Sequence, residues 1–137
     1  MIYKISPHVQ IYKFPITAIS SIANRVTGLG LTGLFISTGL YSLTGNDPVQ
    51  QYKVLDDKYK TVLNYFVSFP ILYHTYGGIR HIVWDKYPKL LNNSSVTKSS
   101  KLLIGFSLLS TYGINKEFSL KLVFENTLSV IKLAIAL

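Results

Sequence analysis

The charged residues divide the chain into long uncharged segments and short polar ones. Residues 26–43 form a run of 18 without a charged side chain, and residues 61–79 form a run of 19. Uncharged, mostly apolar runs of about 18 residues or more are typical of transmembrane helices, and lipid tolerates glycine and proline inside them. The pattern therefore predicts an all-α integral membrane protein with spans at about 16–44 and 61–84.

A third uncharged run, residues 102–115, is shorter. Its 14 residues would cover about 21 Å at about 1.5 Å per residue, less than the roughly 30 Å of the hydrocarbon core. It can span only if its flanks extend it, with Lys98 and Lys101 reaching the interface at one end. We expect a third span at about 98–116, which completes a three-helix membrane anchor at residues 1–115.

The last segment, residues 116–137, has a different pattern. Lys121, Glu125 and Lys132 share one face of a helix, and the remaining residues are mainly Leu, Val, Phe and Ile. This predicts an amphipathic C-terminal extension that lies on a membrane surface or against a partner. An ordinary packed helix with one solvated face is the alternative.

Composition agrees with a membrane location and removes several function classes. Hydrophobic residues make up 48% and charged residues 15%, against a usual charged share of about 25%; the mean hydropathy is +0.30. The absence of cysteine excludes disulfides, thiolate metal sites and a cysteine nucleophile. The net charge of +8 would suit nucleic acid, but the charges avoid the long apolar runs, so we expect lipid and no nucleic acid as a partner.

The basic residues also predict an orientation. Most of the 14 Lys and Arg residues lie in residues 1–25 and 80–101, which three spans would place on the same side of the membrane. Basic loops favour the inner side. The chain is therefore expected to be multi-pass, with its N-terminus inside.

The first span carries a stripe of polar and small residues, namely Ser21, Arg25, Gly28, Thr32 and Gly39. The glycines are equally well explained by a close helix–helix contact. Arg25 is not, because it lies roughly 15 Å from the predicted helix start, and a buried guanidinium needs an anion or several acceptors. No acidic residue lies within a span, so the partner of Arg25 is a ligand or another subunit.

In the second span the notable group is His74. A structural hydrogen bond, a proton relay and a metal ligand are the roles open to it. Gly77 and Gly78 would clear bulk beside it, as a flat macrocycle requires, and His81 follows about 10 Å further along nearly the same direction. Because His74 and Arg25 lie at similar depth, a haem iron bound by His74 would send its propionates toward Arg25.

Three motifs carry a family resemblance: residues 6–13 (SPHVQIYK), 20–28 (SSIANRVTG) and 74–85 (HTYGGIRHIVWD). In this order and spacing, over residues 6 to about 114, the chain resembles the cytochrome b large membrane-anchor subunit of succinate dehydrogenase, respiratory complex II. The resemblance implies a bundle shared with a small membrane-anchor subunit. The two anchors would hold a flavoprotein and an iron–sulfur protein, where succinate is oxidised, and electrons would reach ubiquinone at the junction.

The resemblance also implies roles for single residues. The serine and arginine matching Ser21 and Arg25 line the quinone site, and the histidine matching His74 is an axial ligand of the haem b iron, the second ligand coming from the small anchor. We expect Ser21 to donate to a quinone carbonyl and Arg25 to supply positive charge to the quinone and a propionate. His81 is expected to contact a propionate or make a structural hydrogen bond. His8 lies outside the spans, so we expect it to pack against or dock the peripheral subunits.

The chain departs from the family pattern at Asn24, where histidine is usual, and in the extension at 116–137. Asparagine carries no charge for a propionate, so the alternative is a haem-free structural anchor of a complex II-like or fumarate reductase assembly. The SPHxxIYK motif is mitochondrial in style. We therefore expect the mitochondrial inner membrane with the N-terminus on the matrix side, and the bacterial plasma membrane is the alternative.

Overall fold

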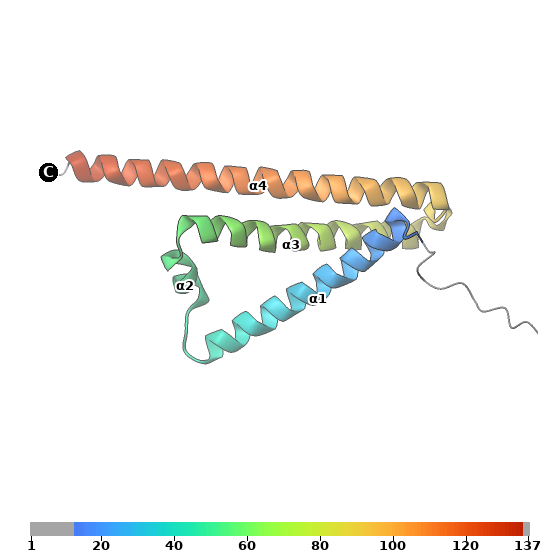
Figure 1. Cartoon of the computed structure of the whole chain (residues 1–137), viewed down its shortest axis with the longest axis horizontal. Helices are drawn as coiled ribbons and strands as arrows, with labels where there is room; N and C mark the ends of the chain where they lie inside the picture. The colour runs from blue at the N-terminus through green and yellow to red at the C-terminus, as the bar shows by residue number, and fades with distance from the viewer. Residues whose placement is uncertain (1–12, 136–137) are drawn as a thin grey trace, which may run out of the picture.

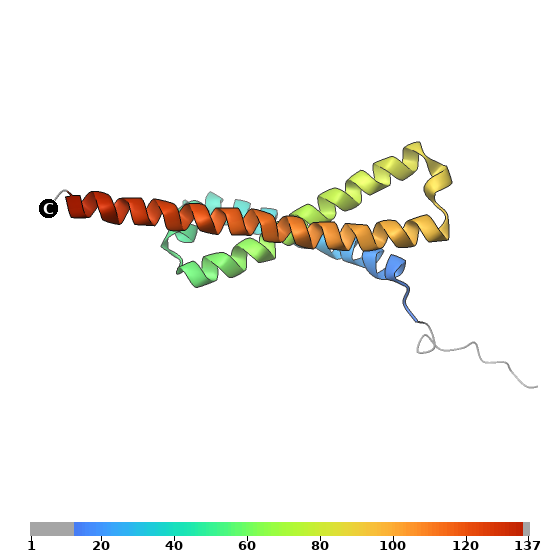
Figure 2. The same ribbon diagram turned by 90° about the horizontal axis from the view of Figure 1, so that it is seen from above.

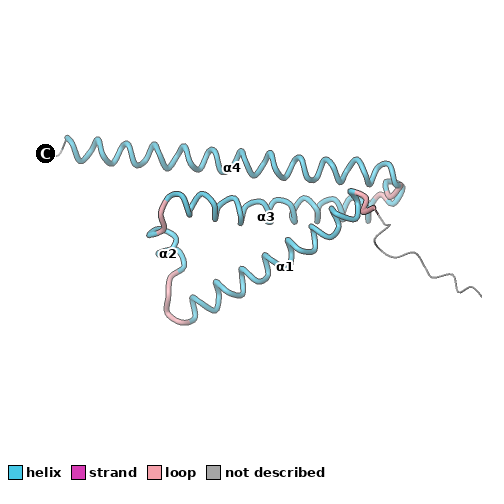
Figure 3. The backbone as a smooth tube through the Cα atoms, in the orientation of Figure 1, coloured by secondary structure: helices cyan, strands magenta, loops and turns pink. Residues whose placement is uncertain are grey.

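A computed structural model of the chain describes residues 13–135, with side chains to residue 117. It contains the α-helices α1 (Ile16–Leu43), α2 (Pro48–Val54), α3 (Asp57–Lys86) and α4 (Asn93–Ile135), and the short 3-10 helix η2 (Pro88–Leu90). Residues 13–135 include no strand (Figure 3). The predicted all-α class is confirmed for this part of the chain.

Local sequence sets where the helices begin. Pro15 precedes α1, where the proline ring suits the entry to a helix and its missing N–H is no loss. Asp47 caps α2 by accepting a hydrogen bond from the backbone N–H of Val49 at 2.8 Å. Asn92 does the same at the start of α4, accepting from the N–H of Ser95 at 2.9 Å.

The three long helices pack against one another. α3 contacts both α1 and α4, and α1 also contacts α4. α4 runs above α3, while α1 diverges from α3 toward its C-terminal end, where α2 joins the two (Figure 1). Seen from above, α3 crosses α4 obliquely (Figure 2). The divergence leaves a wedge between α1 and α3.

The helix bounds refine the predicted spans. α1 agrees with the span at 16–44, while α3 extends beyond 61–84 at both ends. α4 starts before residue 98 and continues through 116 without a break, so the predicted C-terminal extension begins as a direct continuation of the third helix. Its side-chain pattern, and residues 136–137, lie outside what the structure describes.

Apolarity supports one of the three membrane crossings. Among the described residues, α1 is the one helix that is long and apolar enough to cross a membrane, by length and composition. α3 and α4 are less apolar, although residues 61–79 of α3 and 102–115 of α4 carry no charge. The crossings at 61–84 and 98–116 therefore stay predictions.

The contacts between the helices are made largely by small polar side chains. In the described part of the chain, the buried polar residues are Ser20, Ser100, Ser107, Thr111 and Asn115. The buried apolar residues there are only Tyr73 and Leu103, and most large apolar side chains lie on the outside. Small and hydroxyl-bearing residues at helix contacts, with hydrocarbon outward, are typical of helices that pack within lipid.

Candidate functional site

His74 lies on α3 at its contact with α1. Its Nδ1 is 3.0 Å from the backbone carbonyl oxygen of Asn24. Because a carbonyl oxygen only accepts, Nδ1 carries the proton in this bond, and the neutral ring keeps a lone pair on Nε2. A histidine that binds a metal through one ring nitrogen usually donates the N–H of its other ring nitrogen to such an acceptor. His74 is also an exposed residue of this chain, so a group outside the chain can reach it.

Two glycines permit this close contact. A Cβ on Gly28 would lie 2.6 Å from Cε1 of His74, and a Cβ on Gly77 would overlap the side-chain amide of Asn24. The prediction that Gly77 leaves space for a macrocycle is therefore wrong, because Asn24 fills that space. A Cβ on Gly78 would meet nothing within 4 Å, so the surface of α3 is open at Gly78.

Ser21 and Arg25 lie one turn apart on α1, and both are exposed. Their neighbours Ser20 and Asn24 face α3 instead, Ser20 being fully buried. Within the described residues, no hydrogen bond or ion pair is recorded for Arg25. α3 and α4 cover the other side of α1, so the expectation that a ligand or another subunit buries Arg25 stays a prediction. A partner for Arg25 must come from outside the described residues.

His81 lies two turns after His74 on α3 and is exposed. Its ring packs edge-on against Trp84, with ring centroids 5.3 Å apart. The adjacent residue Arg80 contacts the same Trp84 ring. His8 lies outside the described residues.

A cluster around Arg80 was not predicted. Nη1 of Arg80 donates to Oγ of Ser100 at 3.1 Å and lies 3.4 Å from Oγ of Ser20. Tyr73 donates its hydroxyl to Ser20 as well. The sequence offered one signal for this cluster, the seven-residue spacing of Tyr73 and Arg80, which places them two turns apart on one helix face. Nothing in the sequence indicated that Ser20 and Ser100 would join them.

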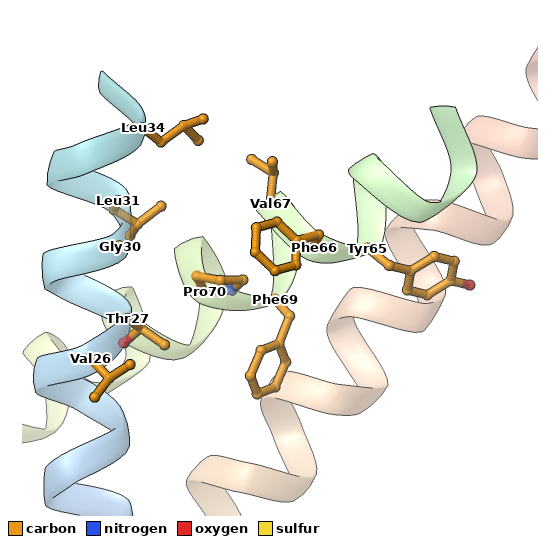
Figure 4. Close-up of a pocket in the computed structure, with 10 residues that line it drawn as sticks. All are labelled: Val26, Thr27, Gly30, Leu31, Leu34, Tyr65, Phe66, Val67, Phe69 and Pro70. Atoms are coloured by element: carbon orange, nitrogen blue, oxygen red, sulfur yellow. The ribbon is translucent and has the colours of Figure 1, made fainter. Parts of the chain in front are cut away.

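An apolar groove of about 350 Å³ fills the wedge between α1 and α3. Figure 4 shows the residues of the two helices that line it, which are Val26, Thr27, Gly30, Leu31, Leu34, Tyr65, Phe66, Val67, Phe69 and Pro70. Thr27 donates its hydroxyl to backbone carbonyls of α1, so it offers little polarity to the groove. Thr27 precedes Gly28, and Pro70 is one turn before His74, so the groove begins beside the His74 contact.

Comparison with known proteins gives the chain a family. The sequence model of the succinate dehydrogenase/fumarate reductase transmembrane subunit family matches residues 2–114. The chain belongs to this family. The membership predicted from the three motifs is thereby confirmed, and the match includes Ser21, Arg25, His74 and His81 but not the extension at 116–137.

Individual members of the family are similar along most of the chain. The mitochondrial succinate dehydrogenase cytochrome b560 subunit of Dictyostelium discoideum is 37% identical over 114 residues, covering 77% of this chain and 58% of the relative. The cytochrome b560 subunits of Reclinomonas americana and Sus scrofa are 33% and 31% identical, covering 78% and 80% of this chain and 80% and 68% of the relatives. The chain thus spans little more than half of the Dictyostelium protein.

Proposed function

We propose that this chain is the cytochrome b membrane-anchor subunit of a succinate:ubiquinone oxidoreductase in the mitochondrial inner membrane. Three crossings, with the N-terminus on the matrix side, would join it to a small membrane-anchor subunit. The pair would hold an iron–sulfur subunit and a flavoprotein, which carry out succinate oxidation. The hydrogen bond between His74 and the Asn24 carbonyl is the observation that carries the proposal, because it leaves a nitrogen lone pair on an exposed ring within the uncharged segment 61–79.

The residues of this chain fit haem b. His74 would hold the iron through Nε2, with the second axial ligand from the small anchor, and the open surface at Gly78 removes one obstacle beside it. Arg25 would neutralise a propionate, with His81 as a second contact. When bound, haem b supplies one-electron transfer close to the quinone site. The chain's own contribution is to fix the imidazole, through Asn24 and Gly28, before the cofactor arrives.

Ser21 and Arg25 would form this chain's part of the ubiquinone site. Reduction of a quinone places negative charge on its carbonyl oxygens, and each oxygen takes up a proton. Ser21 offers a neutral hydrogen-bond donor and Arg25 a fixed positive charge one turn away. Both are exposed, so they can meet a ligand at the junction with other subunits. Preorganised donors of this kind lower the energy of developing charge.

One observation favours a second candidate, a haem-free structural anchor of a complex II-like or fumarate reductase assembly. Asn24 replaces the histidine usual in the family, and its side chain packs against Gly77. Its Oδ1 is buried without a hydrogen-bond partner among the described residues. An amide held there supplies no positive charge to a propionate.

Purification of the chain with its partners in mild detergent tests the proposal. A flavoprotein and an iron–sulfur protein should co-purify, and the reduced-minus-oxidised spectrum should show a b-type band. An assembled complex without that band would select the haem-free anchor. Recovery without a flavoprotein and an iron–sulfur protein would contradict both candidates.

A further inference from the structure

Arg80 meets side chains from all three long helices. Its Nη1 donates to Ser100 on α4 at 3.1 Å and, at the longer distance of 3.4 Å, to Ser20 on α1. The guanidinium carbon lies 4.5 Å from the ring centroid of Trp84, one turn further along α3. The Tyr73 hydroxyl lies 3.1 Å from both Oγ and the backbone carbonyl oxygen of Ser20. Ser20 is therefore held from α3 by two side chains.

The serine and tyrosine side chains of this cluster are closed off from the surroundings, while Arg80 is half-buried. The relative exposure is 0% for Ser20, 1% for Ser100 and 1% for Tyr73. Oγ of Ser20 accepts from Arg80, and it shares the single hydroxyl proton of Tyr73 with the Ser20 carbonyl oxygen. Because Ser20, Ser100 and Tyr73 are buried, removing one partner leaves a buried polar group unsatisfied, which costs more than losing an exposed hydrogen bond. The cluster therefore favours one arrangement of the three helices.

The cluster around Arg80 lies beside Ser21 and Arg25, the two residues proposed to bind the quinone. Ser20 faces inward and the adjacent Ser21 faces outward. Neighbouring residues on a helix point about 100° apart, so fixing Ser20 fixes the direction of Ser21. Arg25 lies one turn further along α1, next to Asn24, where His74 makes the second contact. Rotation of α1 would move both exposed residues together.

We propose that Arg80 is a positioning residue for quinone reduction. It joins Ser20 to Ser100 and so sets the rotation of α1 that presents Ser21 and Arg25 to the ligand. Arg80 does not touch the quinone itself. This inference rests on the quinone role proposed above for Ser21 and Arg25.

The test uses the assembled complex and compares two activities of each variant. In Arg80→Gln, kcat/KM for ubiquinone should fall on the order of tenfold, mainly through KM, because a small displacement of the binding groups is costly. Succinate-dependent dye reduction per complex should stay unchanged. Arg80→Lys should give an intermediate KM, since the ammonium can still donate to the serines but loses the planar stacking on Trp84.

Matched serine and tyrosine variants separate positioning from general helix packing. Ser100→Ala and Tyr73→Phe should raise the quinone KM. Two variants serve as controls. Ser99→Ala removes a hydroxyl that donates within α4 to the Val96 carbonyl. Tyr76→Phe removes a hydroxyl that donates from α3 to Ser110 on α4, away from the Arg80 cluster. Neither control should change KM. Arg80→Gln combined with Ser100→Ala should be no worse than Arg80→Gln alone, because both remove the same contact.

Each outcome decides a question. An unchanged quinone KM in Arg80→Gln and Ser100→Ala, with a raised KM in Ser21→Ala, overturns the inference and leaves the proposed function standing. If Ser21→Ala also has no effect, the quinone role itself is wrong. Should Arg80→Gln fail to assemble, Ser100→Ala decides alone, since it removes one oxygen atom and leaves the charge in place.

Discussion

At the scale of single residues, the bond between His74 and the Asn24 carbonyl links the chemistry of a side chain to the backbone of another helix. The direction of the imidazole therefore depends on where α1 lies. Gly28 makes this possible, because any larger residue would displace the ring. A change in the position of α1 is therefore expected to change the orientation of the His74 ring.

Replacement of His74 by leucine removes the proposed axial ligand. We expect the purified complex of His74→Leu to lose the b-type band or to show an altered spin state, because one ligand position is empty. The reduced-minus-oxidised spectrum measures this. An unchanged low-spin spectrum in a folded complex would refute the assignment of His74.

Gly28→Val tests whether close contact orients the ring. The added side chain would overlap Cε1 of His74, and overpacking of this kind typically costs about 1–3 kcal/mol. We expect less haem per flavin in the purified complex. Gly33→Val is the matched control, since a Cβ at Gly33 meets nothing within 4 Å, and equal haem loss in both variants would argue against the proposed orienting contact.

Ser21→Ala should weaken quinone reduction by about tenfold, if it removes one hydrogen bond worth roughly 1–1.5 kcal/mol. Arg25→Lys should lose more, because the ammonium lacks the planar fork of the guanidinium. Quinone and dye reduction are measured on the same assembled enzyme, and dye reduction should be retained. The control is Ser37→Ala, which removes a hydroxyl that donates to the Leu34 carbonyl of its own helix. A parallel fall of both activities would assign Ser21 and Arg25 to assembly instead.

The sequence predicted that His74 and Arg25 lie at a similar level, and His74 does meet Asn24, the neighbour of Arg25. The pattern did not predict which face of α1 the rest of the chain covers. Ser20 and Ser21 differ by one position, yet one is fully buried and the other exposed. Hydrophobic pattern cannot separate them, because a partner subunit and a neighbouring helix both select small polar residues. Arg80 was missed for a related reason, since its acceptors lie 60 and 20 positions away in the chain.

At the scale of the elements, uncharged runs located the long helices but not their ends. The charged residues at the start of α3 lie outside the uncharged run 61–79 but inside the helix. Capping residues such as Asp47 and Asn92 set the ends instead. The short helix α2 lies in the polar segment between the first two uncharged runs. α4 exceeds its predicted span most, because nothing after residue 116 stops a helix.

The length of α4 makes a prediction about the C-terminal segment. Its 43 residues measure about 65 Å, roughly twice the hydrocarbon core. Lys121, Glu125 and Lys132 also make a second crossing costly, at about 2.5–3.5 kcal/mol for each lysine near the membrane centre. We therefore expect single cysteines introduced at Ser119 and at Ala134 to be labelled from the same side. Labelling from opposite sides would show that this segment crosses the membrane.

At the scale of the whole molecule, the three predicted crossings place the two interhelical connections on opposite sides. The chain has no native cysteine, so Asn46→Cys and Leu91→Cys each report one connection. In sealed vesicles, a membrane-impermeant maleimide should label Asn46→Cys from the same side of the membrane as the C-terminal segment. It should label Leu91→Cys from the opposite side. Labelling of both connections from one side would mean that α3 does not cross.

The polar contacts between the helices have a calorimetric consequence. The heat capacity increment of unfolding comes mainly from apolar surface that becomes exposed to water. Here large apolar side chains such as Leu29, at 76% exposure, already face outward in the folded chain, and in a bilayer or micelle they would stay in hydrocarbon when the helices separate. The enthalpy of helix separation should then vary little with temperature, and cooling should not weaken the bundle as it weakens a water-soluble core.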